Sequence, residues 1–455
     1  MATETLDAPT TLEHSTFVEY AFNHWLDSLK AGVKPKTMCL LGPPGIGKSS
    51  TAYDIAKRMS NYVRANPEII FGEGVNTLAK AVALLQKERN DKTLTDQDIT
   101  SLAYLLDFSS KLPEDLGGLP FRTDDNFVDY CPQRWVGKLC ERFAFGVYVE
   151  DDLPAAAQAM QVAGRQSALE RRVHEHQFTD AILVIVTGNR REDKSSATTL
   201  PAHFRNSVTL LCIEPSLDEW KKWYAKQKGV DPVVAAFLTW KSESLSETPT
   251  ESKDKLGAFA TPRQWHSLGQ QFGTAQRCGG EVLLAVASGL VGKGHALEFT
   301  AFVEIRNTLV EPDKVLDDPR GALPRPADVL DDPSKCVAMV TSLGECSAMR
   351  WKKRTGEARD RVPEQLLAAL AHCSEAVGDE YCAVGVQTFL DLGGNLTAIA
   401  RMARKAKTDP VIGRLLDHVK VALLGLGYGI GGERFSAPPA IPSFCGKPSA
   451  TTQER

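Results

Sequence analysis

The chain has 455 residues, of which 43% are hydrophobic and 24% are charged, and its formal net charge is −4. These values are typical of a globular protein with two or three domains. This net charge gives no support for broad, charge-driven nucleic-acid binding, although a local basic patch could still exist. No apolar stretch reaches the roughly eighteen residues of a membrane-spanning helix, so we expect no membrane span.

The ten cysteines are scattered and include no Cys-x-x-Cys pair. This distribution argues against zinc sites and a disulfide framework, and it favours a reducing compartment. The first residues are polar and acidic and do not resemble a signal peptide. We therefore predict a cytoplasmic protein with reduced cysteines.

Residues 1–16 have no apolar periodicity and are expected to be disordered, whereas residues 17–29 have helical apolar spacing. A short apolar strand is expected at 38–41, and a helix at 50–59. The loop between them matches G-x-x-x-x-G-K-[ST], in which glycines turn backbone N–H groups toward phosphates. The predicted ATP-binding residues are Gly42, Pro43, Pro44, Gly45, Ile46, Gly47, Lys48, Ser49 and Ser50.

Further strands are expected at 103–108, 146–149 and 181–186, and a helical stretch at 66–100. Strands that alternate with helices indicate an α/β fold with a parallel sheet covered on both faces. This is the setting that a phosphate-binding loop requires.

Acidic residues follow the strand at 146–149. We predict that Asp151 joins Ser49 in holding Mg²⁺ and that Asp152 activates water, because hydrolysis needs a metal-holding carboxylate and a group that orients water. The alternative is a solvated acidic turn. Asn189, after the strand at 181–186, could help hold the attacking water, or it could be an ordinary turn residue.

Two arginines complete the candidate site. Arg205 could act in trans on the γ-phosphate of a neighbouring subunit, and Arg263, at the start of a helix, could contact the phosphates from a lid. A single arginine is more often a surface salt-bridge partner, and this remains the alternative for both.

The composition changes after residue 214. Helical patterns at 217–240 and 263–310 surround a polar stretch, and a Pro- and Asp-rich segment precedes a final helical region. We predict a disordered N-terminus at 1–16, a nucleotide domain at 17–214 and a helical lid at 215–310. A linker at 311–333, a C-terminal helical region at 334–431 and a disordered tail at 432–455 complete the predicted organisation.

The order of the motifs resembles that of MoxR-like AAA+ ATPases. The phosphate loop is followed by DLGGLP at 115–120, EDDLPAA at 150–156, ERRVHEHQF at 170–178, TGNR at 187–190 and TPR at 261–263. The resemblance covers residues 17–330. It implies a five-stranded parallel sheet in the order 5-1-4-3-2, a helical lid, and a hexameric ring with ATP between subunits. It also implies a hairpin at 172–177, a pore loop at 111–125, and a protein client that often carries a von Willebrand A-type domain.

Two positions depart from the family pattern. The family usually has Asp-Glu where this chain has Asp151-Asp152, and one methylene less moves the water-orienting carboxylate by about 1.5 Å. Ser207 occupies the usual arginine-finger position, so either Arg205 substitutes or the contact in trans is missing. Arg190 and Arg191 are further candidates.

The leading hypothesis is an ATPase that hydrolyses MgATP in a ring to remodel or activate a protein partner. A nucleic-acid motor or loader is the first alternative, and its best support is the basic cluster at 350–354, followed by the stretch at 401–407. An ATP-gated scaffold with little hydrolysis is the second, because Asp152 is shorter than the usual glutamate. His174 and His176 are expected to pack or face solvent, since no third metal ligand is evident.

Overall fold

A computed structural model describes residues 10–190, 193, 200–224, 226–247, 257–395 and 398–399. It divides into two compact units, residues 1–234 with 241–300 and residues 235–240 with 301–455. The unit boundaries fall within α10 (Val233–Trp240) and α13 (Lys293–Thr308). Arg191, the basic stretch at 401–407 and the predicted tail at 432–455 lie outside the described residues.

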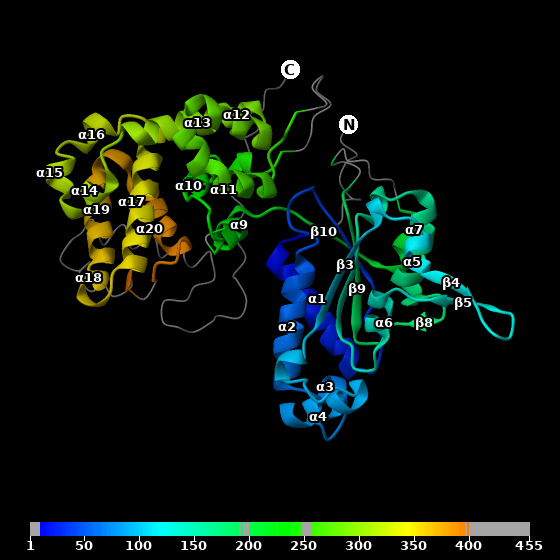
Figure 1. The fold of residues 1–455 in the computed structure, drawn as a ribbon. Coiled ribbons are helices and arrows are strands. Elements are labelled where there is room, and N and C mark those ends of the chain that lie inside the picture. The colour runs from blue at the N-terminus through cyan, green and yellow to red at the C-terminus, as the bar shows by residue number, and fades with distance from the viewer. Residues whose placement is uncertain are drawn as a thin grey trace, which may run out of the picture. The chain divides into compact units, whose positions relative to one another are not determined.

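The first unit contains a parallel sheet of six strands in the order β1-β10-β2-β9-β6-β3 (Figure 1). The five longer strands stand in the predicted order 5-1-4-3-2 when they are numbered along the chain. The strands are β1 (Thr11–Leu12), β2 (Met38–Leu41), β3 (Leu102–Asp107), β6 (Gly146–Asp151), β9 (Ile182–Gly188) and β10 (Thr209–Ile213).

The prediction of five strands and of disorder through residue 16 was wrong in detail. Thr11 and Leu12 pair with Cys212 and Ile213 at the edge of the sheet, and α1 (His14–Lys30) begins directly afterwards. The edge of β10 offers unpaired backbone groups, so a short segment can add to it. Two residues are too few to show a strand periodicity.

The sheet buries both faces, because successive side chains of a strand point to opposite sides. Met38 and Leu40 pack on the face covered by α1 and α2 (Thr51–Ala65), whereas Cys39 lies in the cluster of the opposite face. The second face is covered by α6 (Arg134–Cys140) and α7 (Gln158–Arg165) (Figure 1). The first unit is therefore a three-layer α/β/α structure.

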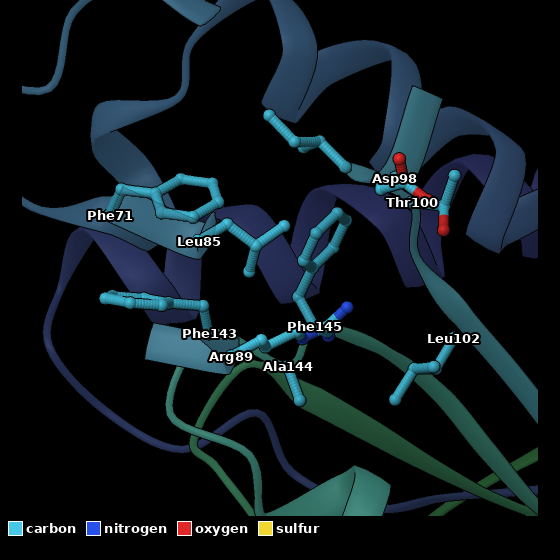
Figure 2. Close-up of a pocket in the computed structure, with 10 residues that line it drawn as sticks. Phe71, Leu85, Arg89, Asp98, Thr100, Leu102, Phe143, Ala144 and Phe145 are labelled. Atoms are coloured by element: carbon cyan, nitrogen blue, oxygen red, sulfur yellow. The ribbon is translucent and has the colours of Figure 1, made fainter. Parts of the chain in front are cut away.

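The stretch at 66–100 adds α3 (Glu68–Phe71), α4 (Leu78–Arg89) and η1 (Asp96–Asp98) beside the sheet. Figure 2 shows a small pocket where these elements meet Phe143 and Phe145. The rings of Phe71 and Phe143 lie 4.9 Å apart. Because aromatic and aliphatic side chains form most of its wall, this region contributes hydrophobic packing.

Two antiparallel hairpins extend the first unit. The segment expected as a pore loop contains α5 (Glu114–Gly117) and β4 (Leu119–Arg122), which pairs with β5 (Val128–Cys131). All residues of β4 and β5 are exposed. The hairpin expected at 172–177 is formed by β7 (Arg172–Val173) and β8 (His176–Gln177). The ring of His174 stacks on Tyr130 at 4.4 Å, and no metal-binding cluster occurs within the described ranges.

Helices follow β10 in the first unit. They include α9 (Leu217–Tyr224), η6 (Ser242–Leu245), α11 (Pro262–Cys278) and α12 (Gly280–Val291), while α8 (Ala202–Ser207) precedes β10. Trp220 Nε1 donates to the carbonyl of Pro262 at 3.1 Å, and Trp265 Nε1 donates to that of Ser244 at 2.7 Å. These buried indoles fix α9 and η6 against the start of α11.

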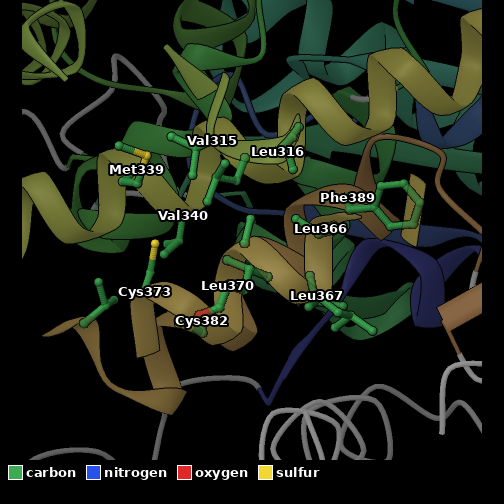
Figure 3. Close-up of a cluster of buried hydrophobic side chains, with 14 of the residues drawn as sticks. Val315, Leu316, Met339, Val340, Leu366, Leu367, Leu370, Cys373, Cys382 and Phe389 are labelled. Atoms are coloured by element: carbon green, nitrogen blue, oxygen red, sulfur yellow. Dashed lines mark hydrogen bonds between the residues drawn. The ribbon is translucent and has the colours of Figure 1, made fainter. Parts of the chain in front are cut away.

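The second unit is helical throughout its described part, and Figure 3 shows its buried core. The prediction of a linker at 311–333 was wrong, because Val315, Leu316, Leu323 and Leu330 are buried in that core. A proline early in each short helix of this segment is preorganised for helix initiation. The helices are α14 (Pro312–Asp317), α15 (Pro319–Ala322), α16 (Pro326–Val329), α17 (Pro333–Lys353), α18 (Gly356–Asp360), α19 (Val362–Val377) and α20 (Asp379–Asp391).

The basic cluster at 350–354 is divided between core and surface, because Arg350 and Trp351 are buried whereas Lys352 and Lys353 are exposed. Arg350 donates to Asp313 and Asp317 at 2.7 Å, and Trp351 is buried against Phe389. A nucleic-acid surface needs aromatic side chains that bases can reach, so burial of Trp351 disfavours this cluster as one. Within the described part of the chain, no helix is long and apolar enough to cross a membrane.

We expect Leu370→Ala to destabilise the second unit by about 2–5 kcal/mol, because the fully buried side chain would leave a cavity. Urea denaturation followed by hydrogen exchange of α19 peptides measures this loss. Leu297→Ala, at a position 48% exposed in the first unit, is the control. Equal effects of the two substitutions would contradict the assignment of Leu370 to the core.

Candidate functional site

The carboxyl ends of four parallel strands meet at one edge of the sheet. In the register of the sheet, Leu41 of β2 lies opposite Gly188 of β9, and Asp107 of β3 lies opposite Asp151 of β6. The residues that follow these positions are therefore neighbours, although the sequence separates them widely. In open parallel α/β sheets, ligands bind at this edge.

The loop of residues 42–50 connects β2 to α2 at this edge. Gly45 adopts a φ of 75°, which favours glycine. A Cβ atom on Gly45 would lie 2.8 Å from Thr261 Oγ1, and one on Gly42 would lie 2.5 Å from the carbonyl oxygen of Ile213. The loop therefore has the strand–loop–helix geometry of a phosphate-binding loop, and it packs against the start of α11.

The Lys48 ammonium is buried at the centre of the edge. Its Nζ donates to the carbonyls of Gly42 and Pro43 and to Asn189 Oδ1, each at 2.8 Å. These contacts use all three of its protons. Burial lowers the pKa of Lys48 to about 8, although Asp152, Asp193 and Asp151 oppose the shift. At pH 7 the lysine therefore remains largely protonated, and the edge holds a buried cation.

The Asp151 carboxylate accepts hydrogen bonds from two hydroxyls. Ser49 Oγ lies 2.6 and 2.8 Å from its two oxygens, and Thr187 Oγ1 donates to Oδ1. One carboxylate and a hydroxyl suit Mg²⁺, which keeps several waters and shares phosphate oxygens rather than occupying an all-protein cage. The residues present therefore fit a phosphate-bound magnesium ion.

Asp152 begins η3 (Leu153–Ala155) in the left-handed conformation, with φ 54° and ψ 34°. Its backbone N–H donates to Thr187 Oγ1 at 3.3 Å. Burial and the neighbouring Asp151 raise the pKa of its carboxyl, whereas Lys48 and Arg263 oppose the shift. A carboxylate with a raised pKa beside the phosphate loop can accept a proton from water.

Glu150, the first of the three acids, does not belong to this edge. It is fully buried and accepts a hydrogen bond from Ser167 in the π-helical turn η4 (Gln166–Glu170). Burial raises its pKa to about 8, so the carboxyl is predominantly neutral at pH 7. Alternation along β6 separates Glu150 from Asp151.

The two predicted arginines differ in position. The backbone N–H of Arg263 donates to the carbonyl of Gly45 at 3.2 Å, and its charge lowers the pKa of Lys48 and Asp152. Arg205 is exposed on α8, and although its backbone N–H donates to the carbonyl of Pro201, its guanidinium forms no hydrogen bond or ion pair with the described part of this chain. The structure thus brings Arg263 to the site and leaves Arg205 outside it. Ser207 Oγ donates to the carbonyl of His203 at 2.8 Å.

Two residues near the site make contacts that the sequence-based prediction did not include. Thr187 lies two positions before Asn189 on one strand, so strand periodicity could have identified it. Arg190, considered a candidate finger, instead donates to Asp193 and Glu214. No local sequence pattern indicates these last contacts, because they depend on which strands are neighbours.

No protein-family model and no curated protein sequence matches the chain. The similar solved structures include NtrX from Brucella abortus, with 11% identity over 88% of this chain and 69% of that chain and a TM-score of 0.32. They also include the Aeropyrum pernix Orc1 protein in complex with DNA, with 15% identity, coverage of 79% and 83%, and a TM-score of 0.29. Both TM-scores are low, so the fold and the site are assigned from this chain's own topology and contacts.

We expect ATP affinity to fall as the pH rises through about 8, because phosphate binding requires the Lys48 ammonium that is losing its proton there. The limiting slope is about tenfold per pH unit. Calorimetric titration between pH 7 and 9.5 measures it, and Lys48→Arg is the matched control because a guanidinium stays charged. The same slope in both proteins would contradict the role assigned to Lys48.

Proposed function

We propose that this chain is an AAA+ ATPase of the MoxR-like type that binds and hydrolyses MgATP. The observation that carries the proposal is the joint arrangement of Lys48 with Asn189 and of Ser49 with Asp151 at one strand edge. These are the positions at which phosphate-loop ATPases bind phosphates and magnesium.

In this proposal residues 42–50 bind the phosphates, and Ser49 and Asp151 hold Mg²⁺. The metal would neutralise charge on the phosphate oxygens. Thr187 orients the Asp151 carboxylate through its hydroxyl and also meets the backbone of Asp152. Asp152 accepts the proton of the attacking water, and Asn189 helps to position that water.

We further propose assembly into a ring, with a hexamer as the family-based expectation. Arg205 is exposed and its guanidinium has no partner within the described chain, so this group is available to a neighbouring subunit. Arg263 would act in cis from the helical lid. Residues 17–214 would form the nucleotide domain and residues 215–310 the lid, and hydrolysis would change the angle between subunits.

The client is proposed to be a protein, contacted by the hairpin of β4 and β5. This hairpin is exposed on both faces and carries Leu119, Phe121 and Val128, whose exposed fractions are 76%, 49% and 61%. Such a concentration of exposed apolar side chains is typical of an interaction site. A von Willebrand A-type domain is the client that the family resemblance favours, with the cytoplasm as the compartment.

An ATP-gated scaffold is the second candidate function. The observation that favours it is Asp152, whose side chain is one methylene shorter than glutamate and whose backbone is held in the left-handed region. Displacements near 1 Å in a catalytic group can cost on the order of a hundredfold in rate. In that case ATP would fix the assembly with little turnover.

Turnover of MgATP per subunit is expected to rise with protein concentration, because Arg205 would complete the site of a neighbour. Steady-state phosphate release over a concentration series measures this, with Lys48→Ala as the blank. Arg205→Ala should lose most of the turnover and keep ATP binding, whereas Arg277→Ala, at an exposed position on α11, should lose little. Concentration-independent turnover would argue against a site shared between subunits.

The length of the Asp152 side chain is expected to limit hydrolysis. Asp152→Glu should raise kcat by roughly tenfold or more, with some loss of thermal stability because glutamate tolerates the left-handed backbone less well. Asp152→Asn keeps that backbone and should abolish turnover while ATP still binds. Single-turnover kinetics and thermal unfolding measure both effects. Full turnover in Asp152→Asn would remove Asp152 from the proposed mechanism.

A further inference from the structure

A cluster of three charged residues joins the ends of two strands. Arg190 follows Asn189 after β9, and Glu214 directly follows β10. Arg190 Nη1 donates to Glu214 Oε1, and its Nε and Nη2 donate to the two oxygens of Asp193 at 3.2 and 2.9 Å. The guanidinium therefore holds two carboxylates at once, the fork geometry that arginine favours.

The cluster crosses over the strand that leads into the phosphate loop. β9 and β10 lie on either side of β2, so their ends are separated by two strand spacings, or about 10 Å. The contact between Arg190 and Glu214 spans this gap. The phosphate loop begins close to this contact, because Gly42 approaches Ile213, the residue before Glu214. A Cβ atom on Gly42 would lie 2.5 Å from the carbonyl oxygen of Ile213.

The cluster is shielded from solvent at its centre. The side chain of Asp193 is 4% exposed, and it also accepts the backbone N–H of Arg190 at 2.9 Å. Burial opposes the charge of Arg190, but the hydrogen bonds that it donates to Asp193 and Glu214 raise the pKa of the guanidinium above its ordinary value. The arginine therefore stays charged, and weak solvent screening keeps its contacts strong.

The two ends of the cluster are connected to different regions, to the phosphate loop through Asn189 and to helix α9 through Glu214. On one side, the amide oxygen of Asn189 accepts a hydrogen bond from Lys48, and the charge of Asp193 favours the protonated form of that lysine. On the other side, Glu214 precedes α9, where Trp220 donates to the carbonyl of Pro262 beside Arg263. A continuous series of contacts thus connects the Lys48 ammonium with α9 and the start of α11.

We propose that Arg190, Asp193 and Glu214 are positioning residues that couple Asn189 to the segment entering α9. The proposal rests on the nucleotide site proposed above. When a γ-phosphate accepts hydrogen bonds from Lys48, the Asn189 amide oxygen loses the hydrogen bond that Lys48 donates to it. Because Arg190 ties this strand end to Glu214, a shift of Asn189 changes the position of α9. ATP and ADP, which differ in that phosphate, then place α9 differently.

Hydrogen exchange of the peptide at 214–224 tests this coupling in the full chain, with ADP and with a non-hydrolysable ATP analogue. The wild type should show different protection with the two nucleotides. Glu214→Gln and Arg190→Gln should each reduce that difference about twofold or more, and the double variant should reduce it no further, because paired residues are non-additive. The affinity for the analogue should change much less than the difference in protection.

Asp218→Asn is the matched control, because this exposed carboxylate in the first turn of α9 has its ion pair with Lys221 at 3.6 Å instead. Additive losses in the double variant, an undiminished difference in Glu214→Gln, or an equal loss in Asp218→Asn would each overturn the coupling. Identical protection of the wild type by both nucleotides would overturn the coupling but leave the proposed function standing. Failure of the wild type to bind either nucleotide would overturn the proposed function as well.

Discussion

Parallel pairing of β2, β9 and β6 is the constraint on which the candidate site depends. Lys48 and Asn189 are 141 positions apart in the sequence, and Ser49 and Asp151 are 102 apart, yet both pairs are within hydrogen-bond distance. The register of the strands places their carboxyl ends side by side, and buried apolar side chains on both faces of the sheet hold that register. Without it, the buried Lys48 ammonium would lose a polar partner at a high energetic cost.

The charges around Lys48 explain which ligand suits the site. Asp151, Asp152 and Asp193 all act on this lysine, so the edge already contains several carboxylates near one buried ammonium. A free polyanion would meet repulsion there, whereas the proposed ligand, a triphosphate with Mg²⁺, would bring positive charge of its own. Arg263 contributes a further cation from α11. Glu150 is neutral and faces inward, so it adds no further negative charge to the carboxylates around Lys48.

Local chemistry made part of this structure predictable from sequence. The phosphate loop and the acidic strand end each have a fixed pattern of residue types, and the structure places Ser49 in contact with Asp151. The edge strand β1 was missed because two residues carry no periodicity. The contact between Arg190 and Glu214 was missed because it depends on β9 and β10 flanking β2. The segment at 311–333 was misread because its prolines begin helices rather than interrupt them.

The backbone after β6 gives a physical reason for an aspartate at position 152. Among non-glycine residues, its left-handed conformation is several-fold enriched in asparagine and aspartate. The turn cannot relax toward β9, since even a Cβ atom on Gly188 would lie 2.4 Å from Pro154 Cγ. The backbone at this strand end therefore favours aspartate over glutamate at position 152. In the proposed mechanism, the reach of that acid therefore depends on the backbone conformation at the end of β6.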